Sequence, residues 1–486
     1  MLDSKLIKIL RTFSSRETEE LSSFLFSPFN KISEKEIQLF EHIKHEHPHY
    51  NNSQKLDKKL LFSLLYPQKK KFDSSLRALM SQLNKHIEDY LIHKELQKAP
   101  LLKEQLLMRA LLENRLPEHL DKKLEQETKR QKKQVEQDCN YFYHLLQVAD
   151  IEFQHTIIND NRSSIKRSHN VMDKLDLYYI ASKLRYASAL MTRQNIIKEE
   201  YNIYLLDEIL ANTEQGTLLE TPYIQFYYHL CLLFKNSDES EIHFHHLKAL
   251  LTTFPKVLSN NEKRQIYAFM ANYCTQQYKS GKEEYLEHVF ELYKDMVQEG
   301  ILIMDDGTIS PHQYKNIATA GLKLGEFAWT EQFIKNYKLK IPKDFRALVF
   351  NYNMAALDFS LANYDRAKIF LLEMSLINSE DVFYSLNHRI LLIKTYYELD
   401  EFDPLKSSLE ALRGYIRRTA QKLSSYNIKA CQNFVNLCHR LLRLRKSNVK
   451  SINSLEKDIR TIRPLVDHQW LLKKVLELQE NESLND

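Results

Sequence analysis

Three short stretches in the C-terminal half of the chain repeat one pattern: Leu324-Gly325-Glu326-Phe327, Leu361-Ala362-Asn363-Tyr364 and Leu399-Asp400-Glu401-Phe402. They recur at intervals of 37 and 38 residues. In each stretch the leucine closes one helix, the middle residues make a turn, and the aromatic residue opens the next helix. A fixed period of this length predicts an array of stacked helix pairs, because a single pair cannot bury its hydrophobic face.

The scarcity of glycine favours a chain built from helices. Only seven of the 486 residues are glycine, against roughly thirty-four expected from a typical share of about 7%. Tight hairpins and phosphate-binding loops depend on glycine, because only glycine reaches positive φ without steric cost. No glycine precedes Gly216, and neither G-x-G-x-x-G nor G-x-x-x-x-G-K occurs. We therefore predict an all-α fold, and the usual dinucleotide-binding and P-loop motifs are excluded.

The middle repeat, within residues 351–374, resembles a known family. The residues that carry the resemblance are Ala355, Asn363-Tyr364-Asp365, Ala367 and Leu371. They match the small residue of the first helix, the turn, and the packing alanine of the second helix in the tetratricopeptide repeat. Thr330 and Leu405 take the place of that alanine in the neighbouring units, so the repeats are degenerate over about residues 135–410. The resemblance implies a superhelix of helix pairs whose inner groove binds peptides or protein segments.

The first hundred residues predict a compact bundle of about five helices. Ser14 with Glu17, and Ser33 with Glu36, have the S-x-x-E spacing of a capping box at a helix start. An apolar stripe of helical spacing then runs through Leu76, Leu79, Met80, Leu83, Ile87 and Tyr90. We predict three regions: a helical bundle over 1–100, tetratricopeptide-like repeats over 101–406, and capping helices with a basic face over 407–486.

The basic face lies between Pro404 and Lys450, where eleven lysine and arginine residues stand against one acidic residue, Glu410. The whole chain carries a net charge of only +5, so this excess is offset elsewhere, for example in the acidic run over 283–306. One interpretation is a solvated face or pairing with that acidic run. The other is contact with a phosphate backbone or an acidic partner. The candidate contacts are Arg413, Arg417, Arg418, Arg440, Arg443, Arg445 and Lys446.

A second resemblance concerns residues 56–95, which are similar to the helix pair of the winged-helix domain in bacterial regulators that carry tetratricopeptide repeats. The matching stretches are 59–62, 64–67 and 76–83. The resemblance implies phosphate contacts from Lys69, Lys70, Lys71 and Arg77. The segment after Tyr90 lacks the glycine-bearing hairpin of a wing, and a plain helical bundle is the alternative.

Cysteine use and hydropathy indicate a cytoplasmic protein. The five cysteines form neither a disulfide framework nor a C-x-x-C pair, and Cys431 and Cys438 share one apolar helical face. We see no signal peptide at the N-terminus. The longest nearly apolar stretch, residues 223–234, is much shorter than the ~20 residues of a membrane span. We therefore expect no membrane partner.

No catalytic constellation is recognisable. Neither G-x-S-x-G nor D-x-D-x-D-G occurs. The histidines cluster in two groups, which we interpret as solvated helix ends rather than a metal site. These groups are His42, His45, His47 and His49, and His243, His245 and His246. We predict no catalytic residue, no cofactor, no bound metal and no enzymatic activity.

Two functions remain as hypotheses. The first is a non-enzymatic scaffold that binds a peptide or protein segment in the groove of the solenoid. The alternative is a nucleic-acid-binding regulator with a helix-turn-helix-like N-terminal domain and a partner-sensing solenoid. A hairpin after Tyr90 would favour the regulator, and internal neutralisation of the arginines over 413–446 would favour the scaffold.

Overall fold

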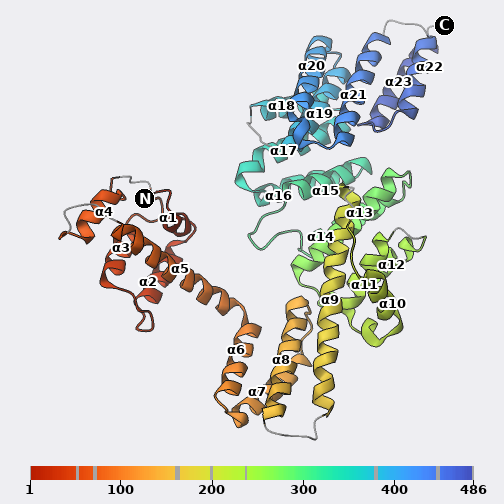
Figure 1. Cartoon of the computed structure of the whole chain (residues 1–486). Coiled ribbons are helices and arrows are strands. Elements are labelled where there is room, and N and C mark those ends of the chain that lie inside the picture. The colour runs from red at the N-terminus through yellow and green to blue at the C-terminus, as the bar shows by residue number, and fades with distance from the viewer. Residues whose placement is uncertain are drawn as a thin grey trace. The chain divides into compact units, whose positions relative to one another are not determined.

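The computed structural model describes residues 2–50, 54–68, 74–158, 165–197, 201–235, 238–376, 381–444 and 449–483 (Figure 1). Within these ranges all regular secondary structure is helical, in 23 α-helices and three short 3-10 helices, and no strand is present. The predicted all-α fold is confirmed. The 3-10 helices are Thr217–Glu220, Lys338–Lys340 and Ala420–Lys422.

The chain divides into two compact units. The first is Met1–Arg185 with Leu206–Ile224, and the second is Tyr186–Leu205 with Gln225–Asp486. The finer division at residues 100 and 406 stays a prediction.

Five helices enclose the core of the N-terminal bundle. They are α1 (Lys5–Leu10), α2 (Ser15–Leu25), α3 (Glu34–Lys44), α4 (Lys58–Leu65) and α5 (Ser75–Lys98). Both predicted capping boxes form, at Ser14 with Glu17 and at Ser33 with Glu36, and in each the backbone N–H of the serine lies 2.8 Å from the glutamate oxygen. The predicted stripe on α5 is buried apart from Met80, which packs at the edge of the core.

The rest of the first unit comprises α6 (Pro100–Glu113), α7 (Pro117–Gln131), α8 (Cys139–Ile158), the first part of α9 (Ile165–Ile197) and α10 (Leu206–Gln215). A buried polar contact joins the first three of these helices. The fully buried His144 of α8 lies 2.9 Å from the Gln105 amide of α6 through Nδ1, and 2.7 Å from a Glu127 oxygen of α7 through Nε2. Because buried polar groups stabilise a fold only when they are paired, this contact fixes α7 and α8 against α6.

The second unit is a succession of helices that pack against their neighbours in the chain. The helices are the last part of α9, most of α11 (Pro222–Phe234), α12 (Ser240–Thr253), α13 (Asn260–Lys279), α14 (Tyr285–Gln298), α15 (Pro311–Lys323), α16 (Phe327–Tyr337), α17 (Lys343–Ser360), α18 (Tyr364–Ser375), α19 (Val382–Glu398), α20 (Phe402–Thr419), α21 (Ser425–Leu444), α22 (Val449–Thr461) and α23 (His468–Ser483). The pairs α13–α14, α15–α16, α17–α18, α19–α20 and α22–α23 pack together. This order of packing is compatible with a helical solenoid.

The three repeated stretches of the sequence form the same turn. The second residue of each has positive φ, at 75° for Gly325, 60° for Ala362 and 57° for Asp400. The amide of the third residue bonds to the carbonyl five residues back, with N to O distances of 2.9, 2.8 and 3.0 Å. This 6→1 bond with a left-handed residue is the C-terminal cap that satisfies the last carbonyls of a helix. The sequence repeat is thus a structural repeat, although only one of the three left-handed positions is glycine.

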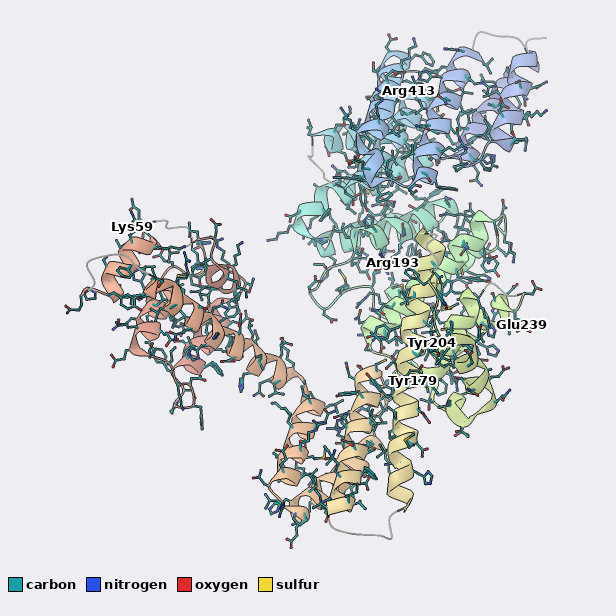
Figure 2. The ribbon with its side chains drawn as sticks, in the orientation of Figure 1. Lys59, Tyr179, Arg193, Tyr204, Glu239 and Arg413 are labelled. Atoms are coloured by element: carbon teal, nitrogen blue, oxygen red, sulfur yellow. The ribbon has the colours of Figure 1, made fainter. Side chains whose placement is uncertain are left out.

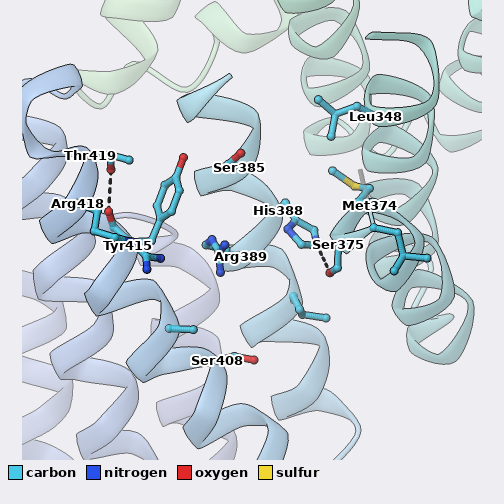
Figure 3. Close-up of a pocket in the computed structure, with 13 residues that line it drawn as sticks. Leu348, Met374, Ser375, Ser385, His388, Arg389, Ser408, Tyr415, Arg418 and Thr419 are labelled. Carbon is cyan, nitrogen blue, oxygen red and sulfur yellow. Dashed lines mark hydrogen bonds between the residues drawn. The ribbon is translucent and has the colours of Figure 1, made fainter. Parts of the chain in front are cut away.

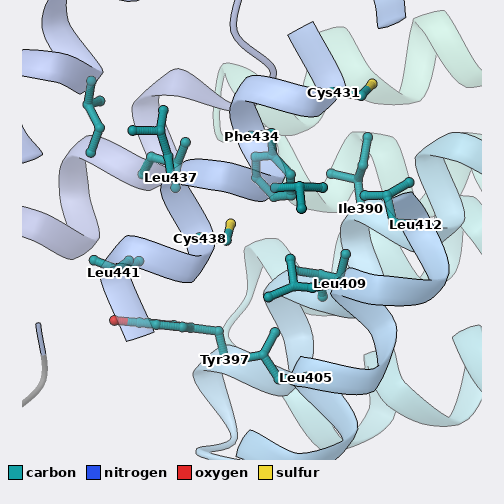
Figure 4. Packing of buried hydrophobic residues seen from close by; sticks show 14 of the residues in the cluster. Ile390, Tyr397, Leu405, Leu409, Leu412, Cys431, Phe434, Leu437, Cys438 and Leu441 are labelled. Atoms are coloured by element: carbon teal, nitrogen blue, oxygen red, sulfur yellow. The ribbon is translucent and has the colours of Figure 1, made fainter. Parts of the chain in front are cut away.

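The C-terminal helices share one hydrophobic core (Figure 4). Leu409 and Leu412 of α20 meet Phe434 and the two thiols Cys431 and Cys438 of α21. Both cysteines are buried, and burial raises the pKa of the Cys431 thiol to about 11, so that it stays protonated. The apolar helical face that these two cysteines share therefore lies in the core.

Candidate functional site

A pocket of about 540 Å³ opens between α17, α18, α19 and α20 (Figure 3). The N-terminus of α19 is fixed beside it by Asp381, whose carboxylate accepts the backbone amides of Phe383 and Tyr384 at 2.9 Å each. One wall is apolar and consists of Leu348, Met374, Leu376, Leu392 and Ala411. The polar lining consists of Ser375, Ser385, His388, Arg389, Ser408, Tyr415, Arg418 and Thr419. No acidic residue is among the 13 lining residues.

Arg389 is the central cation of the pocket. Its guanidinium carbon lies 4.7 Å from the centre of the Tyr415 ring, a distance typical of a cation–π contact. Its Nε is buried and has no hydrogen-bond partner among the described residues. A buried donor without an acceptor costs about 1–3 kcal/mol. A ligand that supplies an acceptor at this position would remove that cost.

Arg418 adds a second positive charge to the same end of the pocket. Figure 3 shows Arg389, Tyr415 and Arg418 grouped together, while His388, Ser375 and Met374 lie toward the other side. Burial lowers the pKa of Arg389, and the charge of Arg418 lowers it further, partly opposed by Tyr415. The two guanidinium groups therefore repel each other. Since none of the described residues that line the pocket is a carboxylate, this end of the pocket favours an anion.

His388 has a structural role at the opposite wall. Its Nε2 donates to the carbonyl of Leu371 at 2.8 Å, and the hydroxyl of Ser375 lies 3.4 Å away. Burial lowers the pKa of His388, so the ring is neutral near pH 7. The ring therefore fixes α19 to α18 and leaves the cationic character of the pocket to the arginines.

A second hollow of about 450 Å³ lies between α20 and α21. Arg413, labelled in Figure 2, and Arg417 line it together with Gln432 and Asn436. Arg413 pairs with Glu410 at 3.1 Å, whereas Arg417 forms no ion pair with any described residue. The side chains of the Arg413–Glu410 pair are about half exposed, so water screens their attraction.

The structure brings part of the predicted basic set together on one helix. Arg413, Arg417 and Arg418 all belong to α20, where they line the two hollows on either side. Arg440 on α21 pairs with Asp458 of α22 at 2.6 Å, and Arg443 also lies on α21. The partners of Arg413 and Arg440 thus come from the C-terminal region itself and not from the acidic run over 283–306. Arg445 and Lys446 lie outside the described residues.

Of the candidate phosphate contacts in the N-terminal region, the structure describes only one. Lys69, Lys70 and Lys71 lie outside the described residues, and Arg77 is exposed near the start of α5. Residues 91–98 continue α5 as a helix, so the hairpin of a wing is not formed in this described segment. The sequence resemblance to a winged-helix domain therefore extends no further than the helix pair.

Histidines of the first cluster contact backbone carbonyls, and histidines of the second cluster contact the ring of His229. His42 Nε2 lies 3.1 Å from the carbonyl of Lys55, and His47 Nε2 lies 2.9 Å from that of Phe13. In the second cluster His243 Nδ1 lies 3.1 Å from that of His229, and His246 stacks on the same His229 ring with 4.7 Å between the ring centres. In the part of the chain that the structure describes, no three potential ligands are arranged to hold a metal ion.

One spacing within the first cluster matches a known zinc-binding motif. Residues 45–49, His-Glu-His-Pro-His, match the H-E-x-x-H pattern that places two zinc-binding histidines one turn apart on a helix. Here α3 ends at Lys44, and the stretch forms turns instead. Glu46 pairs with Lys55 at 2.9 Å. The required helical context of the motif is therefore missing.

Arg389 and Tyr415 are the site residues that the sequence did not reveal. Arg389 stands on α19 between the buried Leu386 and Ile390, which is an unusual position for an unpaired cation. An arginine among buried apolar residues could have marked Arg389 as a candidate. The sequence does not show that Tyr415 and Arg418 of the next helix line the same pocket.

Comparisons with known proteins add no assignment. Neither the family models, nor the curated proteins, nor the solved structures contain a match to this chain. Among the described helices none has the length and apolar character needed to cross a membrane.

Proposed function

We propose that the protein is a non-enzymatic interaction scaffold that holds a segment of a protein partner in the pocket between α17 and α20. The observation that carries this proposal is the pocket itself, because it combines an apolar wall with cationic donors that no described residue satisfies. A segment of a partner would place an apolar side chain against Leu348 and Met374 and an acceptor at Arg389.

A tetratricopeptide-like arrangement supports the same proposal. Ala355 and Ala367, the small residues of the middle repeat, are both fully buried, and the three turns share one backbone geometry. Stacked helix pairs of this kind create an extended surface for binding a chain segment by shape and side-chain pockets. The five free cysteines fit a cytoplasmic location for such a scaffold.

Selection from a random peptide library displayed on phage, with full-length protein as bait, tests the proposal. Ala411 lines the pocket and is exposed, so Ala411→Trp fills the pocket without disturbing the core. Ala110→Trp, at an exposed position of α6, is the matched control. Selected peptides should bind the wild type and the control, and they should not bind the Ala411→Trp variant. Selected peptides that bind all three proteins equally would contradict the proposal.

A nucleic-acid-binding regulator is the second candidate, and one observation favours it. Arg417 is exposed on α20 beside the second hollow and has no carboxylate partner among the described residues. Arginines of this kind contact phosphates, and binding through them weakens steeply with salt. Fluorescence anisotropy with random duplex DNA and single-stranded RNA, at ~50 mM and ~200 mM salt, measures this. Salt-sensitive binding that Arg417→Gln weakens would support the regulator.

A further inference from the structure

The pocket between α17 and α20 presents two positive charges without a counter-ion. Arg389 and Arg418 form no ion pair with any described residue, and none of the pocket-lining residues is acidic. The cation–π contact with Tyr415 fixes the position of the Arg389 guanidinium before any ligand arrives. A fixed donor loses little conformational entropy on binding, so the site is preorganised for an anion.

Some hydrogen-bond donors of the pocket have no acceptor among the described residues. Arg389 Nε is one of them, and it is buried. The hydroxyls of Ser385 and Ser408 line the same pocket and make no hydrogen bond to a described residue. A planar guanidinium matches an anion with several oxygens, because it offers two parallel N–H groups at once.

From these contacts we propose that the pocket recognises a phosphoryl group on the bound protein segment, with Arg389 and Arg418 as its ligands. The inference rests on the proposed scaffold function and names the chemistry of the segment. Phosphorylated serine, threonine or tyrosine carries a charge of about −1.5 to −2 at pH 7. This charge balances both guanidinium groups, whereas a single carboxylate leaves one of them uncompensated.

The apolar wall distinguishes a protein segment from a nucleic acid. Leu348, Met374, Leu376 and Leu392 line the pocket beside the arginines. A residue that flanks the phosphorylated one can bury an apolar side chain there. A nucleic-acid backbone presents a charge at every step and has no such side chain to place against this wall.

The test uses the full-length protein and fluorescein-labelled degenerate peptides in fluorescence anisotropy. Separate pools carry phosphoserine, phosphothreonine or phosphotyrosine at a central fixed position, and matched pools carry the unmodified residue or glutamate. At least one phosphorylated pool should bind about tenfold or more tightly than its unmodified and glutamate counterparts, as expected for charge-assisted hydrogen bonds.

The variants are Arg389→Gln, Arg418→Gln and Arg417→Gln. Arg418 is exposed, so its replacement leaves the fold intact even if Arg389→Gln disturbs it. Arg389→Gln and Arg418→Gln should each weaken binding of the phosphorylated pool about tenfold. Arg417→Gln is the matched control, because it removes the same charge from the adjacent residue, which faces the other hollow. Its binding should stay within about twofold.

The outcomes separate this inference from the proposed function. Equal binding of phosphorylated and unmodified pools, abolished by Ala411→Trp, would overturn the phosphoryl inference and leave the scaffold in place. A preference for the glutamate pool, or efficient competition by single-stranded DNA, would overturn it in favour of another anion. The absence of binding by every pool would overturn the inference and the scaffold proposal together.

Discussion

Gly321 and Thr330 face each other where α15 packs against α16, with no room for even one additional carbon atom. A Cβ on residue 321 would overlap the hydroxyl of Thr330 and lie 3.1 Å from the ring of Phe290. Thr330 is fully buried, and its hydroxyl donates to the carbonyl of Glu326 at 2.7 Å. This is the unit in which threonine replaces the packing alanine, and a glycine opposite makes room for it.

The first prediction follows from this pair. Gly321→Ala should destabilise the protein by about 1–3 kcal/mol, because the added methyl group forces side chains or backbone apart. Thr330→Ala should lower the free energy of unfolding by less. The double variant should lose about 1 kcal/mol less than the two single losses added together. Urea denaturation of the four proteins measures this coupling. Strictly additive effects would show that the two residues do not compete for the same space.

The second prediction concerns the left-handed residue of each repeated turn. Ala362 has a φ of 60°, which costs an L-residue roughly 1 kcal/mol. Ala362→Gly should therefore raise the free energy of unfolding by about 0.5–1 kcal/mol. Gly325→Ala, at the equivalent position of the preceding turn, should lower it by a similar amount. Thermal denaturation of the two variants tests the pair, and shifts of the same sign would contradict it.

The sequence predicted the local features of the fold well. The capping boxes at Ser14 and Ser33, the stripe on α5 and the repeated turns all depend on residues close together in the chain. The buried contact of His144 joins groups 17 and 39 residues apart. No sequence period reports such a separation.

The pocket was beyond sequence prediction for a related reason. The charge count drew attention to α20 and α21, which hold five of the six arginines between Pro404 and Lys450, while Arg389 lies on α19, outside that stretch. Whether an arginine is free depends on the nearest carboxylate in space. Glu410 and Asp458 neutralise Arg413 and Arg440, and only the packed helices reveal that Arg389 and Arg418 have no such partner in the part of the chain that the structure describes.

The third prediction uses the buried contact in the first unit. Burial works to raise the pKa of Glu127, but the hydrogen bond and charge of His144 and the charge of Arg130 outweigh it, so the pKa is lowered. A lowered folded-state pKa adds stability above the unfolded-state pKa, and this stability is lost as the pH falls through the folded-state value. Glu127→Gln should therefore destabilise the protein by about 1–3 kcal/mol at pH 7.

The pH dependence and a neighbouring residue supply the controls. The difference between wild type and Glu127→Gln should shrink as the pH falls below the unfolded-state pKa of about 4.3 and through the lowered folded-state pKa, where the native carboxylate becomes protonated. Glu125→Gln removes an exposed pair with Lys129 on the same helix and should leave the stability nearly unchanged, because water screens this pair. A difference for Glu127→Gln that is constant from pH 7 to pH 3 would contradict the assigned role of its charge.

The fourth prediction concerns the attachment of the last helix to α19. Lys474 of α23 lies 2.8 Å from Glu398 of α19, and the two side chains are only 8% and 10% exposed. The other Glu398 oxygen accepts the indole N–H of Trp470 at 2.7 Å. Glu398→Leu leaves the buried ammonium and the indole without this partner, and should cost about 3 kcal/mol. Glu477→Gln removes the more exposed partner of the same lysine and should cost less than about 1 kcal/mol.

The fluorescence of Trp470 measures the stability of these variants. In a Trp329→Phe background it is the only remaining tryptophan of the two in the chain, so its fluorescence follows the C-terminal core during denaturation. Burial works to lower the pKa of Lys474, but its hydrogen bonds to Glu398 and Glu477 outweigh it and the pKa is raised. The stabilisation is therefore complete at neutral pH and is lost only in strongly alkaline solution, as the pH rises through the raised pKa. Equal losses for Glu398→Leu and Glu477→Gln at pH 7 would show that burial of the Glu398 pair does not determine how firmly α23 is held.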